Sequence, residues 1–167
     1  YVLYQVTLPV QYRINISFLK PNDTAVVNLN KFQLLSETKD SIYTRFLNLV
    51  SSKSFQKSVF LEGGYENKFN ETNEPVDDVE AYASEIINST KLLSVRIESM
   101  RIAKNNGNYQ ESTKVELPYV LSINGENPNV LSEYLDEVAS KANQQTVLNI
   151  ANLEQKKASN RLEQITL

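Results

Sequence analysis

The sequence contains no cysteine, no histidine and no tryptophan, and it has only four glycines. The lack of cysteine excludes disulfides and thiolate metal sites. It suits an oxidising compartment, although many cytosolic domains also lack cysteine. The lack of histidine removes the usual base for serine or cysteine nucleophiles and the commonest metal ligand, so only carboxylates, Lys and Tyr remain as acids or bases. We therefore expect no metal, no cofactor and no enzymatic activity.

Phosphate-binding loops and basic patches are missing as well. Neither the Gly63-Gly64 pair nor Gly107 lies in a Walker or dinucleotide-type motif, so nucleotide binding has little support. The net charge is -3, and Lys and Arg are scattered along the chain, which argues against nucleic acid as a partner. The apolar segment 1–8 is far shorter than the ~20 residues that span a bilayer, so we expect no transmembrane helix or signal peptide within these residues.

The most informative pattern is a helical one of about forty residues, from about Gly125 to Leu167. Asn127 can cap its first free amides, and Pro128 suits the first helical position. At ~1.5 Å per residue this helix would be about 60 Å long, so we expect most of it to be buried by something outside the chain. Its apolar residues form one stripe at three-and-four spacing: Leu131, Tyr134, Leu135, Val138, Ala142, Thr146, Ile150 and Leu153.

That stripe supplies the candidate contact residues for arm packing or oligomer formation, which are Leu131, Leu135, Val138, Ala142, Ile150 and Leu153. Beyond Leu153 the stripe thins into the polar segment 154–157 and resumes weakly at Leu162 and Ile165. Two interpretations stay open for this end of the helix. It is either a solvated helix end or the first arm of a helical hairpin.

The first half of the chain predicts one strand and two short helices. Residues 10–18 alternate between apolar and polar side chains, as in a half-buried strand. Thr38 can cap a helix that runs to about residue 50, and the Ser51-Ser52 pair can interrupt that helix and cap a second one. We expect the Gly63-Gly64 pair to end the second helix and the polar segment 65–75 to form a surface loop without a role in the core.

Asp77 and Asp78 lie at the start of a third predicted helix, which runs from about Asp77 to Ser89. Together with Glu80 they have the pattern of a capping box with charges that the helix dipole favours. Paired acids could also perform carbohydrate chemistry, and residue type alone does not exclude that. We favour capping.

The second half predicts two strands before the long helix. Segments 92–103 and 115–123 alternate, and the Asn105–Asn108 segment between them has the composition of a tight turn, which indicates an antiparallel hairpin. The predicted fold is α+β: a small mixed or antiparallel sheet, short helices on one of its faces and a long C-terminal helical arm. We divide the chain into an α+β base, residues 1–127, and the long helix, residues 128–167.

Three segments in this order resemble a known family. They are the Pro9–Arg13 segment directly after an apolar run, the Leu34–Phe60 segment, and the Pro118–Asn143 segment leading into the long helix. Together they are similar to the periplasmic part of the Wzz-type polysaccharide chain-length determinants, also called polysaccharide co-polymerases. The match covers most of the chain, and each segment is a packing pattern without a chemical signature.

The resemblance implies a specific biology. Members of this family are held in the bacterial inner membrane by two transmembrane helices, and their periplasmic domain has an α+β base with a long helical arm. They assemble into oligomeric rings that set the length of O-antigen or related lipopolysaccharide glycans made by a Wzy-type polymerase, and they do not transfer sugars themselves. By this resemblance we expect self-association, a polymerase and its glycan as partners, and attachment to the inner membrane through helices absent from this chain. The resemblance also implies that the base, residues 1–127, is the membrane-proximal part.

The sequence departs from the family by lacking the descending helix, the last base strand and the second membrane helix. We therefore expect the segment 128–167 to be the first half of a truncated arm. Two further classes stay open, the periplasmic domain of a related polysaccharide-export tyrosine kinase and a helical-hairpin envelope adaptor. The kinase would carry a Walker motif downstream, and the adaptor would carry a Gly-rich β-domain.

Overall fold

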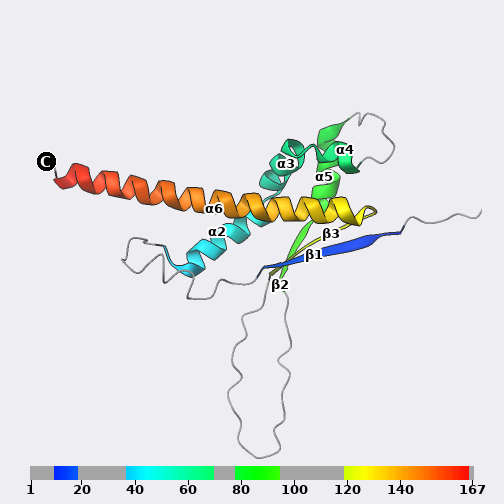
Figure 1. The fold of residues 1–167 in the computed structure, drawn as a ribbon, viewed down its shortest axis with the longest axis horizontal. Coiled ribbons are helices and arrows are strands. Elements are labelled where there is room, and N and C mark those ends of the chain that lie inside the picture. The colour runs from blue at the N-terminus through cyan, green and yellow to red at the C-terminus, as the bar shows by residue number, and fades with distance from the viewer. Residues whose placement is uncertain (1–9, 19–36, 70–77, 95–118, 166–167) are drawn as a thin grey trace, which may run out of the picture.

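The computed structural model describes residues 10–18, 37–69, 78–94 and 119–165, and these residues form an α+β fold, as predicted. The elements, in chain order, are β1 (Tyr12–Phe18), α2 (Lys39–Ser51), α3 (Lys53–Glu62), α4 (Tyr65–Phe69), α5 (Val79–Ser89), β2 (Lys91–Ser94), β3 (Tyr119–Gly125) and α6 (Pro128–Ile165). Figure 1 shows α6 as the longest element, which crosses the whole molecule. No helix among these residues is both long and apolar enough to cross a membrane.

The sheet has three strands in the order β1-β3-β2, and both pairings are antiparallel. Leu121 of β3 lies between Ile16 of β1 and Leu92 of β2, so apolar side chains meet across all three strands. The antiparallel pairing of β2 with β3 confirms the pairing predicted for these two strands. The predicted turn at 105–108 and the strand residues 95–103 and 115–118 lie outside the described residues.

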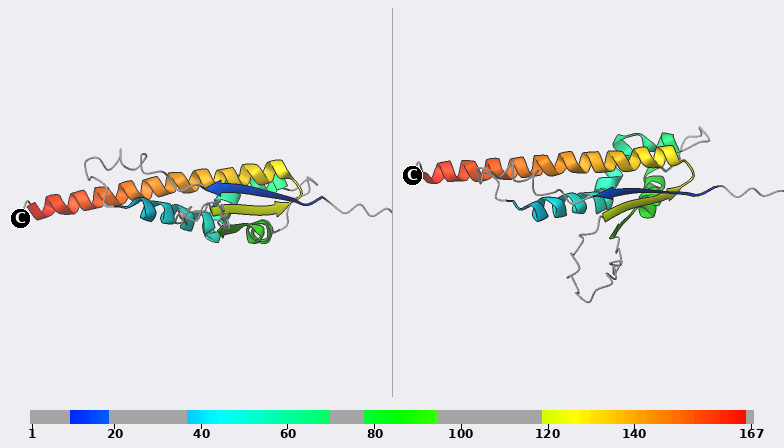
Figure 2. Two further views of the ribbon diagram at one scale, coloured as in Figure 1. Left: turned by 90° about the horizontal axis from the view of Figure 1, so that it is seen from below. Right: turned by 60° about the horizontal axis from the view of Figure 1, so that its bottom comes forward.

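The alternation predicted for residues 10–18 holds from Arg13 to Phe18, whereas Val10 and Tyr12, expected on the apolar face, are exposed. Ile14, Ile16 and Phe18 pack into the core, whereas Arg13, Asn15 and Ser17 on the opposite face are exposed. Figure 2 shows α6 lying along the sheet and then extending well beyond its end. The apolar face of the sheet therefore forms one wall of the core, and the first half of α6 covers it.

The predicted helix starts are confirmed by hydrogen bonds from side chains to free backbone amides. Thr38 Oγ1 accepts from the amide of Ser41 at 3.2 Å, and Asn127 Oδ1 accepts from that of Val130 at 3.2 Å. The Ser51-Ser52 interruption is also present, because Ser52 ends α2 and caps α3. Each of these caps can be predicted because it depends only on neighbours in the sequence.

The predicted surface loop at 65–75 is wrong in its first part. Residues 65–69 form the helix α4, Tyr65 is completely buried, and Phe69 packs against the core. Gly64 permits this turn back into the molecule, since its φ of 62° is a conformation that glycine adopts without strain. Residues 70–75 lie outside the described residues.

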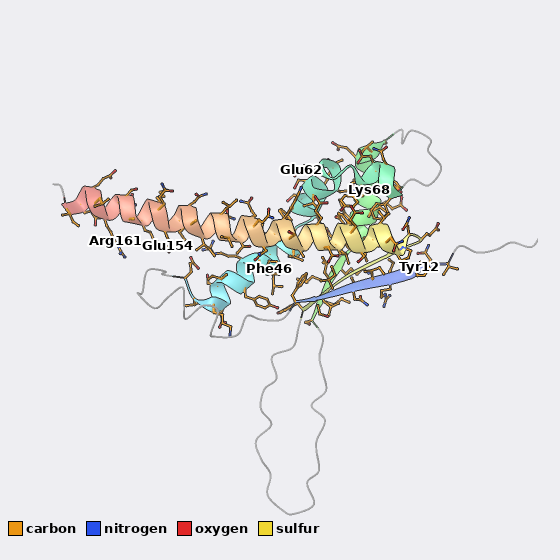
Figure 3. The ribbon with its side chains drawn as sticks, viewed as in Figure 1. Tyr12, Phe46, Glu62, Lys68, Glu154 and Arg161 are labelled. Carbon is orange, nitrogen blue, oxygen red and sulfur yellow. The ribbon has the colours of Figure 1, made fainter. Side chains whose placement is uncertain are left out.

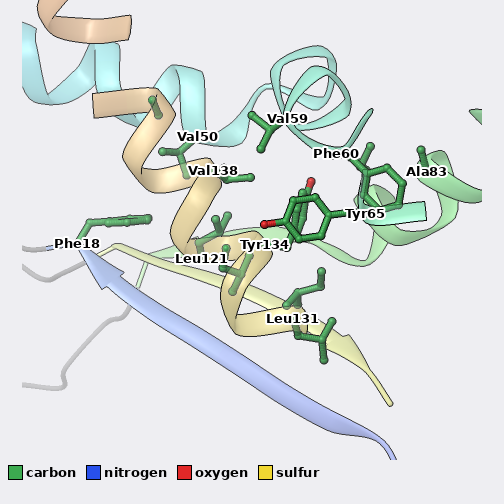
Figure 4. Packing of buried hydrophobic residues seen from close by; sticks show 14 of the residues in the cluster. Phe18, Val50, Val59, Phe60, Tyr65, Ala83, Leu121, Leu131, Tyr134 and Val138 are labelled. Atoms are coloured by element: carbon green, nitrogen blue, oxygen red, sulfur yellow. The ribbon is translucent and has the colours of Figure 1, made fainter. Parts of the chain in front are cut away.

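The core lies between the sheet, the first half of α6 and the shorter helices. Its bulkiest fully buried members are aromatic or branched aliphatic, and Figure 4 shows many of them converging on α6: Tyr65, Tyr134, Phe60, Leu121, Ile123, Leu131 and Leu135. The backbone comes close to this core at Gly125, where an added Cβ would lie 3.1 Å from Leu131 Cδ2. The first turn of α6 is therefore seated directly on the end of β3.

Candidate functional site

The six candidate contact residues of the long helix lie mostly inside the chain's own core. Leu131, Leu135, Val138, Ala142 and Ile150 are buried, and Leu153 is half-buried. The predicted stripe is therefore confirmed as the buried face of α6. We expected something outside the chain to bury most of this helix. That expectation is wrong for the part from Leu131 to Ile150, because the base of the same chain covers it. A role for these six positions between copies stays a prediction.

The helix α2 is the neighbour of α6 that the sequence did not reveal. Val50, near the end of α2, lies beside Val138 of α6 in Figure 4. Glu37, just before the start of α2, is close enough to Lys157 of α6 for their charges to interact. The two helices therefore run antiparallel, and α2 lies along α6 to about the eighth turn of α6, where Lys157 lies.

An aromatic cluster joins α3 and α4 to the first half of α6. The rings of Tyr65 and Tyr134 meet edge to face, with centroids 5.2 Å apart. Phe60 lies 5.8 Å from Tyr134 and stacks on Phe69 at 5.8 Å. Pairs at these distances contribute about 0.5–1.5 kcal/mol each beyond the area they bury. This cluster, made of Phe60, Tyr65, Phe69, Tyr82 and Tyr134, is called the aromatic joint below.

Polar contacts surround the aromatic joint. Tyr65 O–H donates to Glu137 Oε2 at 2.7 Å, and Lys141 Nζ lies 3.3 Å from Glu137 Oε1 and 2.8 Å from Glu62 Oε2. Lys68 bridges to Glu133 at 2.7 Å, and its Nζ lies 4.3 Å from the centre of the Tyr65 ring. Figure 3 shows Glu62 and Lys68 on the side of α6 where α3 and α4 lie. These contacts fix the rotation of α6 about its own axis.

The pKa values at the aromatic joint follow from these contacts. The hydrogen bond from Tyr65 lowers the pKa of the Glu137 carboxyl, and the charge of Lys141 adds to that effect. Burial raises the pKa of the Tyr65 hydroxyl, and its hydrogen bond to Glu137 raises it further. The arrangement therefore holds a neutral phenol against a charged carboxylate, which stabilises the packing.

Gln56 ties three helices together at the centre of the molecule. Its side-chain Nε2 donates to the Val50 carbonyl of α2 at 2.7 Å, and its backbone carbonyl accepts from Tyr134 O–H at 3.2 Å. Gln56 is itself almost completely buried. Nothing in the local sequence pattern marks it, since a glutamine in a polar stretch usually lies on the surface.

One shallow depression among the described residues lies at the end of the sheet. It has a volume of ≈ 260 Å³ and is lined by Gln11, Tyr12, Arg13 and Asn124. Arg13 Nε donates across the strands to Asn124 Oδ1 at 3.0 Å. The depression is open to solvent and polar, and a cross-strand hydrogen bond already engages its charged group.

Two of the three acidic residues considered as a pair or capping box lie within the described residues, Asp78 and Glu80, and both have structural roles. Asp78 caps α5 by accepting from the amide of Ala81 at 2.9 Å, and Glu80 bridges to Lys57 at 2.9 Å. A strict capping box is therefore wrong, because Glu80 is one residue too early to close it. Asp77 lies outside the described residues, within which no three acidic side chains gather as metal ligands.

The second half of α6 differs in character from the first. After Ile150 its side chains are exposed or half-buried, including Leu162 and Ile165. Figure 1 shows this half projecting away from the sheet and from the helices α3 to α5.

No family model matches the sequence, and a search of curated proteins finds no match for it either.

Proposed function

We propose that this chain is the periplasmic portion of a non-catalytic regulator of bacterial surface polysaccharide length, of the Wzz type. In this role it acts as one unit of an oligomeric scaffold at the inner membrane, beside a Wzy-type polymerase. The glycans concerned are O-antigen or related lipopolysaccharide chains. The mechanism is physical: the base packs against neighbouring copies, and the arms form a wall whose size biases when a growing glycan leaves the polymerase.

One observation supports this proposal most directly. A 38-residue helix is fixed on a small α+β base through its first half and projects through its second. A projecting arm on a rigid base is what a scaffold of this kind requires, and the order of sequence segments resembles the same family. The aromatic joint adds rigidity to the first half of α6, which is fixed to the base.

The test is made in the organism that produces the protein. Deleting the full-length gene should change the length distribution of the surface glycan on a gel while total polymer persists. Complete loss of polymer would argue for an enzyme or exporter, and an unchanged distribution would remove the proposal.

Complementation then tests the scaffold itself. The full-length gene carrying Tyr65→Ala, which breaks the aromatic joint, should fail to restore the length distribution. The same gene carrying Tyr12→Ala, an exposed tyrosine at the end of the sheet, should restore it. Equal restoration by both would mean that a rigid connection between arm and base is not required.

A further inference from the structure

The outer face of the sheet, on the side away from α6, carries only positive charge. Its exposed residues follow from the strand register and are called the sheet face: Arg13, Asn15, Ser17, Lys91, Leu93 and Asn124. Neither Arg13 nor Lys91 has a carboxylate partner among the described residues. A third cation, Lys53 at the start of α3, lies close enough to Lys91 for their charges to interact. The sheet face therefore suits a negatively charged surface.

The outer side of α6 carries the opposite charge where the helix lies on the base. Glu133, Asp136 and Ser140 are exposed there and are called the helix face. They lie about 140–180° around the helix axis from Leu131, which lies against the end of β3. Glu133 bridges to Lys68, yet its side chain stays 56% exposed. Asp136 has no ion-pair partner among the residues that the structure describes.

We infer that the sheet face of one copy docks on the helix face of the next copy of this chain, with their long helices pointing the same way. Such a contact is heterologous, so it continues from copy to copy until a ring closes. Either face set against itself would bring like charges together, which disfavours a twofold pair. The inference deepens the proposed function and rests on it for the common direction of the copies.

The charges of the two faces lie at matching heights on the base. By strand register, Arg13 lies one residue and Lys91 three residues before the end of β3, which places them about 3 and 10 Å from that end. The turn after β3 leads straight into α6. Glu133 and Asp136 then lie about 8 and 12 Å along that helix. Copies that stand side by side at one level therefore bring opposite charges together.

The remaining residues of the two faces allow close approach. About 17 Å from the end of β3, the sheet face presents Ser17 and Leu93, which flank the half-buried Val120. Leu93 is 46% exposed, so a neighbour at this level would remove apolar surface from water. Ser140 of the helix face lies at about 18 Å, and its small side chain leaves room for that contact.

Charge reversal tests the contact. Sedimentation equilibrium of the whole 167-residue chain over roughly 10 to 500 μM at low salt should show association that continues beyond a dimer and weakens as salt is added. Lys91→Glu and Asp136→Lys, each alone, should weaken association about tenfold, since each turns attraction into repulsion. The double variant, or a mixture of the two single variants, should recover most of the loss. Lys156→Glu, at an exposed position on the projecting half of α6, is the matched control and should change little.

Cross-linking gives an independent reading, because the native sequence has no cysteine. A short bismaleimide should join Ser17→Cys to Ser140→Cys when the two variants are mixed, and it should join neither variant to itself. Cross-links within a single variant would show a face that meets itself and would overturn the inference. So would a monomer throughout the concentration range, or association indifferent to both charge reversals.

This inference and the proposed function fail separately. Association that depends on these charges, with a glycan length distribution that gene deletion leaves unchanged, would keep the contact and remove the proposed function. A distribution that depends on the gene, with a chain that stays monomeric, would keep the proposed function and remove the contact.

Discussion

Replacing Tyr65 tests the burial of α4, the segment that the sequence analysis expected to be a surface loop. Tyr65→Ala removes a fully buried ring that contacts Phe60, Phe69 and Tyr134, and it also removes the donor to Glu137. Truncation of a buried aromatic side chain costs about 3–5 kcal/mol of unfolding free energy. For a chain of this size that lowers the melting temperature by about 6–20 °C. A residue in a polar surface loop would cost about 0.5 kcal/mol or less.

Tyr65→Phe separates the hydroxyl from the ring. It keeps the aromatic packing and loses one hydrogen bond to a charged group, which we expect to cost about 1–2 kcal/mol because Glu137 remains partly solvated and keeps Lys141. Urea denaturation followed by far-ultraviolet circular dichroism measures both variants, since the chain has no tryptophan to report by fluorescence. Tyr12→Ala is the matched control, with an expected loss below about 1 kcal/mol. If Tyr65→Ala were no more costly than that control, the burial of α4 would be refuted.

The cost of losing the hydroxyl should depend on pH. The Tyr65 hydroxyl lowers the pKa of Glu137 in the folded state below its usual value of 4.5. A lowered pKa contributes stability above the unfolded value, and that stability is lost as the pH falls through the folded one. The difference between wild type and Tyr65→Phe should therefore be full near neutral pH and shrink below pH 4.5. A difference that stayed constant into strong acid would contradict the charged hydrogen bond.

Two further substitutions probe local contacts, each with its own control. Gly63→Ala should lower the unfolding free energy by about 1–3 kcal/mol, because its Cβ would lie 2.4 Å from Tyr65 Cε2. Its control, Gly64→Ala, should lower it by about 1–2 kcal/mol through the φ of 62° alone. Adding Tyr65→Ala should relieve the clash in the Gly63 variant and not the strain in the Gly64 variant, as measured by urea denaturation. Lys53→Ala should lower the unfolding free energy by about 1 kcal/mol, because Lys53 Nζ donates to two carbonyls at the end of α5. Its control, Lys57→Ala, breaks only an exposed ion pair and should lower it by about 0.5 kcal/mol or less. Equal losses for the two lysines would argue against the capping role of Lys53.

Local signals made the helix starts and the buried face of α6 predictable. Asn127 and Thr38 cap helices through bonds to amides three residues away, so the sequence contains all that is needed. The stripe from Leu131 to Ile150 is likewise a property of one helix, and its buried members match the prediction.

The failures concern contacts between distant segments. The five-residue helix α4 is too short to be stable by itself, and only its packing against Tyr134 and Glu137 orders it. The Tyr65 and Phe69 pair, spaced by four, was the one available signal for that helix. Gln56 and the partnership of α2 with α6 had no signal in periodicity, because both depend on which helices meet in three dimensions.

Because α6 is held at one half only, a tilt of the helix moves its far end most. Its first half is fixed by the core, and about 22 Å of helix continues past Ile150, since each residue adds 1.5 Å. A tilt of roughly 10° about Ile150 would displace the far end of the helix by about 4 Å. A load applied at the far end of α6 therefore acts on the buried contacts of its first half, including those of Tyr134 in the aromatic joint.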